Sequence, residues 1–206
     1  MKKNKIKNVI TDFGQVVVYF KPSYMVGQYV KDSNDAKLLE TVVFDRLYWN
    51  DLDAGTIENE EVLNCCYKRL PKRLHQVAKE IYYNWIYNIP EIEGMKELLT
   101  ILKEKYNVRL ILLSNISKYF AFHSHEIQVL KLYDKCYYSS LIGYVKPNVE
   151  IFDYVLKDLN IKAEETIFID DLISNVEGAK KLKINGYLFD GNVIKLKEYL
   201  INMLEN

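Results

Sequence analysis

The sequence predicts an α/β protein, with a parallel sheet covered by helices on both faces and an inserted α-helical cap. Short apolar runs alternate with segments of helical periodicity over the second half of the chain, and this pattern is typical of such sheets. The first two apolar runs are separated by far more chain than the about 30 residues of a strand–helix–strand unit. The excess has helical spacing and apolar faces of its own, so it predicts a separate helical unit.

The first strand is expected at Ile6–Thr11, where β-branched residues dominate. Residues 15–20 also have an extended pattern and are expected to form a short hairpin or flap. From Lys21 onward the apolar spacing becomes helical. Helices are expected around residues 26–30, 38–43 and 62–70 and over residues 73–86, with a loop at residues 48–56 between them.

After Pro90 the chain alternates between helices and strands with short links. Helices are expected at residues 95–105, 117–130, 148–159, 176–182 and 194–204, and strands at residues 108–113, 135–139, 166–169 and 186–189. We therefore assign residues 1–19 and 89–206 to an α/β core domain and residues 20–88 to the helical cap.

The composition restricts the partners and the location. Among 206 residues, Lys plus Arg and Asp plus Glu each number 28, which argues against a broad basic surface for nucleic acid or an anionic membrane. No apolar run approaches the about 20 residues that span a bilayer, and none has the form of a signal peptide. The three cysteines favour a reducing cytoplasm over a disulfide framework. We expect a cytoplasmic monomer or homodimer.

Polar side chains follow several of the predicted strands, and one lysine precedes a predicted helix. They are Asp12, Ser114, Asn115, Lys146, Asp170 and Asp171. In open parallel sheets, ligands bind outside the carboxyl ends of the strands. We therefore expect these side chains to meet in one crevice, with the cap lying over it.

The residue types in this crevice indicate a phosphorylated ligand and a divalent cation. Three carboxylates repel one another and only Lys146 opposes them, so a cation with oxygen ligands such as Mg²⁺ would balance the site. A serine hydroxyl, backbone N–H groups and a lysine suit phosphate. A carboxylate can also act as a nucleophile and form an acyl phosphate, which water then cleaves.

Four segments of the chain resemble the four motifs of the haloacid dehalogenase (HAD) superfamily, in the right order. They are Val9–Gly14, Leu112–Asn115, Lys146–Pro147, and Phe168–Asp171 with Asn175–Ala179 after it. The insertion between the first two resembles the α-helical cap of subfamily I on a Rossmann-like core. The first motif and the cap segment Trp49–Ile57 are similar to the glucose-1-phosphatase-like and epoxide-hydrolase N-terminal-like phosphatases.

The resemblance implies a set of metal ligands. Asp12 would be both nucleophile and Mg²⁺ ligand, and the carbonyl of Gly14 would be a second ligand. Asp171 would be the direct carboxylate ligand of the fourth motif, with Asp170 beside it.

The resemblance also implies which residues bind phosphate. Ser114 and Asn115 would hold the phosphate, and Lys146 would bind it while steadying the Asp12 carboxylate. The expected function is that of a Mg²⁺-dependent phosphatase that hydrolyses a small phosphorylated metabolite through an aspartyl-phosphate. A sugar phosphate is one candidate substrate.

One position departs from the usual phosphatase pattern. Most phosphatases of this superfamily carry a second Asp two residues after the nucleophile as general acid/base, whereas this chain has Gly14. Asp51 and Asp53 of the cap are candidate replacements. A good leaving group, such as the anomeric oxygen of a sugar 1-phosphate, would need less help from an acid.

Two alternative functions remain open from the sequence. The first is a haloacid-type dehalogenase, which also lacks the second Asp but needs no metal, so Asp170 and Asp171 argue against it. The second is a catalytically weak HAD-fold protein that binds a ligand or partner through its cap, for which Gly14 is the only support. A mutase is disfavoured because it needs the missing acid/base.

Overall fold

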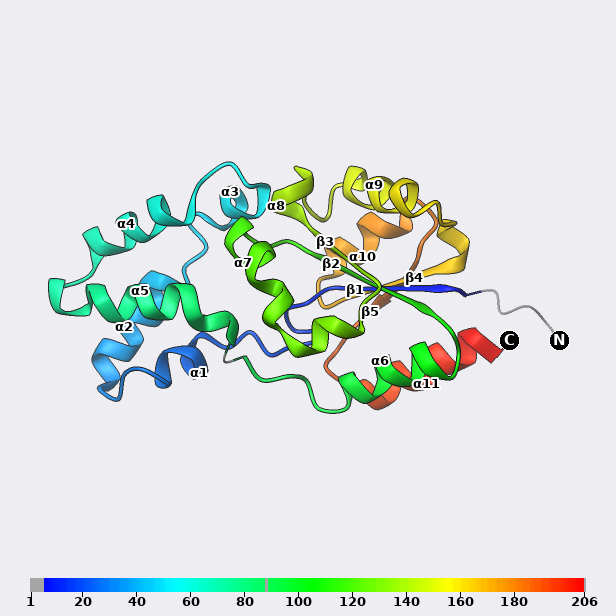
Figure 1. Cartoon of the computed structure of the whole chain (residues 1–206), viewed down its shortest axis with the longest axis horizontal. Helices are drawn as coiled ribbons and strands as arrows, with labels where there is room; N and C mark the ends of the chain where they lie inside the picture. The colour runs from blue at the N-terminus through cyan, green and yellow to red at the C-terminus, as the bar shows by residue number, and fades with distance from the viewer. Residues whose placement is uncertain (1–5, 88, 206) are drawn as a thin grey trace.

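The computed structural model describes residues 6–87 and 89–205, and a parallel sheet forms the centre of the α/β region (Figure 1). The strand order is β3-β2-β1-β4-β5, and all adjacent strands are parallel. The strands are β1 (Asn8–Thr11), β2 (Arg109–Ser114), β3 (Lys135–Tyr138), β4 (Thr166–Asp170) and β5 (Asn185–Leu188). Helices lie on both faces, so the predicted fold class is confirmed.

Alternate residues of β1 point to opposite faces of the sheet, and each face has its own hydrophobic cluster. The covering helices are α6 (Met95–Glu104), α9 (Val149–Leu159), α10 (Ile173–Lys180) and α11 (Val193–Glu205). Val9 packs in the cluster that includes α6 and α11, and Ile10 packs in the cluster that includes α9 and α10. All four residues of β1 are buried, including the polar Asn8 and Thr11 at its two ends.

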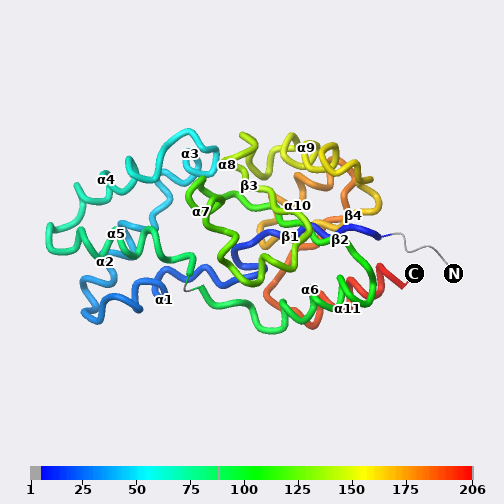
Figure 2. Tube along the Cα trace, in the orientation of Figure 1, coloured from blue at the N-terminus to red at the C-terminus, as the bar shows by residue number. Residues whose placement is uncertain are grey.

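A second group of helices lies at one end of the sheet and has a hydrophobic cluster of its own (Figures 1 and 2). It contains α1 (Pro22–Gly27), α2 (Ser33–Val43), α3 (Trp49–Ala54), α4 (Asn59–Arg69) and α5 (His75–Asn84). The chain enters this group after β1 and returns to the sheet before α6. The division into core and cap stays a prediction, and its boundary residue 88 lies outside the described residues.

Residues 48–56 were expected to form a loop, and this expectation is wrong because the segment contains the helix α3. Gly55 ends α3 in a left-handed conformation with φ of 72°, which glycine adopts without steric cost. Its N–H donates to the carbonyls of Asp51 and Leu52. The helix has only six residues, and a segment this short shows no apolar periodicity in the sequence.

The helix expected over residues 117–130 is shorter than predicted. Helix α7 (Lys118–His123) is followed by two 3₁₀ turns, η3 (Ser124–Glu126) and η4 (Gln128–Leu132), and the residue between these turns is extended. The hydroxyl of Ser124 donates to the carbonyl of Ala121 at 2.8 Å. Such local side-chain bonds compete with the helical hydrogen-bond pattern.

The hairpin or flap expected at residues 15–20 is a tight turn instead. The N–H of Val17 donates to the carbonyl of Phe13 at 2.9 Å, and Gly14 forms an isolated bridge with Val18. Gln15 takes a left-handed conformation with φ of 56°. The turn directs the chain from the end of β1 toward the helical group.

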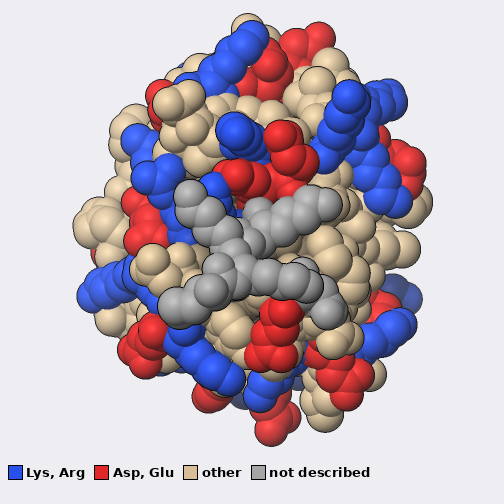
Figure 3. Space-filling view, turned by 90° about the vertical axis from the view of Figure 1, so that its right-hand side faces the viewer, with Lys and Arg blue, Asp and Glu red and all other residues tan. Residues whose placement is uncertain are grey.

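Within the described residues, no helix combines the length and apolar character that crossing a membrane requires. The face of the molecule that Figure 3 shows carries basic and acidic side chains interspersed with one another. This face therefore presents no single sign of charge.

Candidate active site

The register of the sheet places three of the predicted site residues at one edge. Asp12 follows β1, whose last residue is paired with Leu112 of β2 and Ile169 of β4. The N–H of Asp12 donates to the carbonyl of Ile169 at 2.9 Å. Ser114 ends β2 and Asp170 ends β4, so the carboxyl ends of three adjacent strands converge as predicted.

Lys146 connects the carboxylates of two of these strands. Its Nζ lies 2.8 Å from Oδ1 of Asp12 and 2.8 Å from Oδ2 of Asp170, and its side chain is only 1% exposed. Burial alone would lower the pKa of the Lys146 ammonium, but the two carboxylates outweigh burial and raise this pKa above its ordinary value. Lys146 therefore carries its charge inside the protein.

The Asp12 carboxylate takes up a proton at a higher pH than an ordinary aspartate does. Burial raises the pKa of Asp12 to about 6, and the nearby charge of Asp170 adds to this effect against the attraction of Lys146. The Asp12 side chain keeps 15% of its surface exposed. The charge of a cation near Asp12 would favour its ionised form.

Asp170 is fully buried, and hydrogen bonds surround its carboxylate. It accepts from Nζ of Lys146 at 2.8 Å, from the N–H of Leu172 at 2.9 Å, and from Nδ2 of Asn175 at 3.0 and 3.1 Å. Asp170 does not line the cavity, whereas its neighbour Asp171 does. Sequence reasoning missed the role of Asn175, although this residue was part of the fourth segment.

The chain around Lys146 is fixed by Asn115 and by α10. The Asn115 side chain donates to the carbonyl of Lys146 and accepts from its N–H, both at 2.9 Å. A side chain at Gly178 would place its Cβ 2.3 Å from the carbonyl oxygen of Pro147, so the absence of a side chain lets α10 approach this loop closely. Asn115 also lines the cavity, and its predicted role in binding phosphate stays a prediction.

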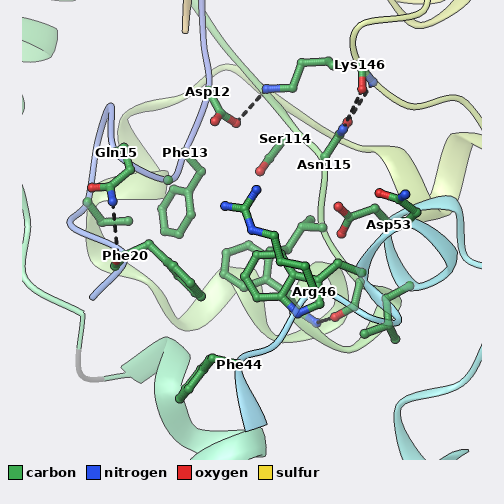
Figure 4. A pocket seen from close by; sticks show the side chains of 18 of the residues that line it. Asp12, Phe13, Gln15, Phe20, Phe44, Arg46, Asp53, Ser114, Asn115 and Lys146 are labelled. Carbon is green, nitrogen blue, oxygen red and sulfur yellow. Dashed lines mark hydrogen bonds and ion pairs between the residues drawn. The ribbon is translucent and has the colours of Figure 1, made fainter. Parts of the chain in front are cut away.

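The site opens into a cavity of about 410 Å³ between the sheet edge and the helical group (Figure 4). The sheet side contributes Asp12, Gly14, Ser114, Asn115, Lys146 and Asp171. The opposite wall comes from the helical group and the chain leading into it, including Phe20, Phe44, Arg46, Trp49, Leu52, Asp53, Tyr82 and Trp85. A polar end and an aromatic wall are typical of sites for small molecules.

Three carboxylates of the site are close enough to share a cation. One oxygen each from Asp12, Asp170 and Asp171 can be chosen so that all three lie within 4.8 Å of one another. Burial, and the adjacent charge of Asp170, raise the pKa of Asp171. Hard oxygen ligands with a single opposing ammonium suit a divalent ion such as Mg²⁺.

Comparison with known proteins agrees with this arrangement. The family described as haloacid dehalogenase-like hydrolase matches residues 50–188. The chain belongs to this family. Its members are hydrolases, so the protein is an enzyme of the HAD type.

Three known proteins illustrate the similarity. A D-ribitol-5-phosphate phosphatase of Bacteroides thetaiotaomicron is 28% identical over 190 residues, which cover 86% of this chain and 88% of the relative. A drimenol cyclase of Aspergillus calidoustus is 30% identical over 151 residues, 68% of this chain but only 27% of the cyclase. A HAD family enzyme of B. thetaiotaomicron, solved with magnesium and inorganic phosphate, has a TM-score of 0.68 and 19% identity, covering 91% of this chain and 96% of that one.

The helical group of this HAD hydrolase contributes to the cavity a carboxylate that the sequence names as a candidate. Asp53 lines the cavity, whereas Asp51 is exposed and does not. Burial raises the pKa of Asp53 to about 7, and the negative charge of Asp12 adds to this against Lys146 and Arg46. Its carboxylate makes no hydrogen bond or ion pair with any residue that the structure describes.

Sequence reasoning missed Arg46, which comes from the loop before α3. Figure 4 shows its guanidinium pointing into the cavity, and its Cζ lies 5.2 Å from the ring centroid of Trp49. Among described residues it has no ion-pair partner. One arginine among helical segments carries no distinguishing pattern, and only its place three residues before Trp49 could have drawn attention to it.

Proposed function

We propose that this protein is a Mg²⁺-dependent phosphatase that hydrolyses a small phosphorylated metabolite through an aspartyl-phosphate on Asp12. The observation that carries the proposal is the contact between Asp12 and the buried Lys146, 2.8 Å apart, at the floor of a cavity also lined by Ser114 and Asp171. A nucleophilic carboxylate, a fixed cation and a hydroxyl donor are the groups that phosphoryl transfer needs.

Lys146 supports this chemistry by holding the nucleophile and offering positive charge. Its bond to Asp12 fixes one carboxylate oxygen, which leaves the other oxygen able to face a phosphorus atom in the cavity. Its partner Asp170 is itself held by Asn175 and a backbone N–H, so the ammonium cannot move far. Such fixed charges stabilise a transition state without reorganising.

The reaction would proceed in two displacements at phosphorus. A carboxylate oxygen of Asp12 forms a bond to phosphorus while the ester P–O bond breaks, and the alcohol departs with a proton. Water then attacks the same phosphorus, its proton is removed, and inorganic phosphate leaves as the Asp12 carboxylate is restored. Ser114 lies where its hydroxyl can donate to a phosphoryl oxygen in both steps.

The cluster of Asp12, Asp170 and Asp171 fits a magnesium ion, with the Gly14 carbonyl as a further ligand. Asp171 would supply the direct carboxylate of the fourth motif, since Asp170 is enclosed by hydrogen bonds and lies outside the cavity wall. When bound, the ion would offset the charge of the carboxylates and of the phosphoryl group.

Support also comes from the known proteins, because a ribitol phosphate phosphatase matches over 86% of the chain. The haloacid-type dehalogenase is the second candidate, but such a reaction has no need of the acidic cluster. A ligand-binding protein without activity would have no need of the buried Lys146–Asp12 pair. The substrate is left as a phosphate monoester, with sugar phosphates among those to be tested.

The proposal is tested by measuring phosphate release from p-nitrophenyl phosphate and a set of sugar phosphates. Activity should require Mg²⁺, stop on addition of EDTA, and disappear in Asp12→Asn. The matched control is Asp153→Asn, which removes a carboxylate from an exposed ion pair with Lys157 and should leave activity unchanged.

Two results would count against the proposal. Phosphate release that persists in Asp12→Asn would exclude Asp12 as the nucleophile. Chloride release from a short haloacid in the presence of EDTA, without phosphatase activity, would favour the dehalogenase instead.

A further inference from the structure

No residue has yet been assigned to transfer the proton that the proposed reaction requires. The alcohol must receive a proton in the first displacement, and the attacking water must lose one in the second. Gly14, two residues after Asp12, has no side chain for this task. We call the wall formed by the helical group the cap wall, and the wall at the strand ends the sheet wall. In-line attack by Asp12 requires that the departing oxygen face away from the sheet wall and toward the cap wall.

Asp53 is a carboxylate on that wall. It lies on α3 and lines the same cavity as Asp12, and Figure 4 shows its carboxylate on the opposite side of the cavity from Asp12. No hydrogen bond or ion pair to a described residue occupies it. A largely buried carboxylate without a partner is costly, so its retention points to a contact that forms only with substrate.

Gly55 fixes the position of α3 against the core. A Cβ at Gly55 would lie 2.5 Å from the carbonyl oxygen of Ser140 in α8 (Ser139–Ile142). Helices α3 and α8 therefore approach more closely than a side chain at this position would permit. Lys118 of α7 adds an ion pair with Glu58, at 2.7 Å, just after α3. Both contacts hold Asp53 over the sheet edge.

Burial, together with the charge of Asp12, keeps Asp53 protonated to a higher pH than an ordinary aspartate. Burial is the main cause of its raised pKa, and Asp12 at the end of β1 adds to it. Lys146 and Arg46 oppose this effect. Lys118 and Glu58, near the C-terminal end of α3, form an ion pair with each other at 2.7 Å, and Asp51 on α3 is exposed. A pKa near the working pH is what general acid–base catalysis requires.

We propose that Asp53 is the general acid and base of this enzyme, supplied by the cap in place of the side chain that Gly14 lacks. This inference rests on the proposed phosphatase function. In the first displacement the ester oxygen takes the Asp53 carboxyl proton as the P–O bond breaks, leaving a neutral alcohol and an Asp53 carboxylate. In the second, that carboxylate accepts a proton from the attacking water, and Asp53 is ready for another cycle.

The proposal changes the expectation about substrates. Without an acid, the enzyme would be restricted to esters of good leaving groups. With Asp53 in place, esters of ordinary alcohols become substrates as well.

The test compares two esters of similar size and different leaving-group basicity, p-nitrophenyl phosphate and benzyl phosphate. p-Nitrophenolate leaves without a proton, whereas the benzyl alkoxide does not. Asp53→Asn should lower kcat/KM for benzyl phosphate by roughly 10²–10³-fold, while kcat/KM for p-nitrophenyl phosphate changes by less than about threefold, because kcat/KM reports the displacement in which the alcohol leaves. Asp51→Asn, on the same helix but exposed, should leave both values unchanged.

Two further measurements separate catalysis from a merely structural role. The benzyl phosphate kcat/KM of the wild type should fall at high pH as Asp53 loses its proton, and this fall should be missing in Asp53→Asn. Adding Gly14→Asp to Asp53→Asn should restore part of the benzyl phosphate activity, since a Cβ at Gly14 meets no atom within 4 Å.

The outcomes distinguish this inference from the function on which it rests. Equal loss of kcat/KM on both esters in Asp53→Asn, or no loss on either, would overturn the role of Asp53 while the phosphatase stands. A wild type that hydrolyses p-nitrophenyl phosphate but not benzyl phosphate would overturn it too. A wild type that releases phosphate from neither ester nor from sugar phosphates would overturn the proposed function, and this inference with it.

Discussion

The two walls of the cavity differ in whether their charged residues are paired with one another. On the sheet side, Lys146 is paired with both Asp12 and Asp170 at 2.8 Å and is almost fully buried. On the cap side, Arg46 and Asp53 point into the same cavity without a bonded partner among the described residues. The sheet wall therefore has its lysine already in contact with two carboxylates, whereas the charged groups of the other wall have no such contact with a described residue.

The difference assigns different tasks to the two walls. A prearranged set of charges at the strand ends is suited to the chemical step, which is the same for every phosphate ester. Unpaired groups on the helical wall are suited to the part of the substrate that varies, and to protons that must move. Single substitutions in either wall test this division of tasks.

The largest effect is expected from Lys146→Met, which breaks the sheet wall. The substitution leaves the carboxylates of Asp12 and Asp170 buried without their cation, and this costs on the order of 3–5 kcal/mol of stability. Activity should fall by at least roughly 10²–10³-fold. Chemical denaturation and phosphate release measure the two effects.

Lys157→Met is the matched control for this substitution. Lys157 also pairs with an aspartate, Asp153 at 2.6 Å, but its side chain is 76% exposed. Its loss should change stability by less than about 1 kcal/mol. Similar losses of stability in both variants would show that burying Lys146 does not increase the contribution of its ion pairs.

The next effect is expected from Gly55→Ala, which displaces the cap wall while leaving its charges in place. The added Cβ would meet the Ser140 carbonyl oxygen at 2.5 Å, and the residue has φ of 72°. We expect a loss of about 2–3 kcal/mol from strain and overpacking. The kcat/KM for benzyl phosphate should fall more than that for p-nitrophenyl phosphate, because Asp53 moves with α3.

Gly143→Ala separates these two causes. Gly143 has φ of 77° but no atom within 4 Å of an added Cβ, so it shares the conformational strain without the contact. It should lose only about 1 kcal/mol and keep the ratio of activities on the two esters. A Gly55→Ala variant that behaves identically would mean that close approach to α8 does not position Asp53.

The sheet wall could be predicted from the sequence to a large extent. Each of its charged groups follows a strand or stands near a helix start, and parallel strands bring their carboxyl ends to one edge. Asp12, Ser114 and Asp171 accordingly lie together on the cavity wall. The contacts that fix Lys146, namely the Asn115 amide and the close packing at Gly178, depend on loop geometry that local patterns do not specify.

The cap wall was far less predictable. The sequence pattern predicts a loop where the short helix α3 lies, and it gives no signal at Arg46. The sequence of a short helix indicates which of its faces is apolar. It does not indicate which end of a group of helices meets the sheet. Asp53 could be named as a candidate, yet only the fold separates it from Asp51.

A smaller effect is expected from Arg46→Gln, which removes the unpaired cation of the cap wall. A guanidinium that faces the cavity should bind an anionic substrate through charge-assisted hydrogen bonds, each worth about 1.5–3 kcal/mol. The KM should therefore rise roughly tenfold, with kcat changed less. Arg73→Gln, which removes an exposed partner of Asp35, should leave KM unchanged. An unchanged KM in Arg46→Gln would show that the cap cation does not contact substrate.

The smallest effect is a change of stability with pH in Asp53→Asn. The pKa of Asp53 in the folded protein is raised from 3.8 to about 7, so the folded state binds the proton more tightly than the unfolded state does. The stability that this group contributes is therefore fully present below about pH 4 and is lost as the pH rises through about 7. Asn carries no such charge, so the variant should match the wild type below about pH 4 and become the more stable of the two as the pH rises.

At pH 8 in EDTA, Asp53→Asn should be more stable than the wild type by about 1–2 kcal/mol. The full shift of about three pKa units would correspond to about 4 kcal/mol, and water in the open cavity reduces it. Melting temperatures should rise by about 2–4 °C for each kcal/mol, while Asp51→Asn shows no such pH-dependent gain. A gain in stability together with a loss of activity is expected of a residue retained for catalysis. Equal stability at pH 8 would mean that the cap wall accommodates the ionised Asp53 without substrate.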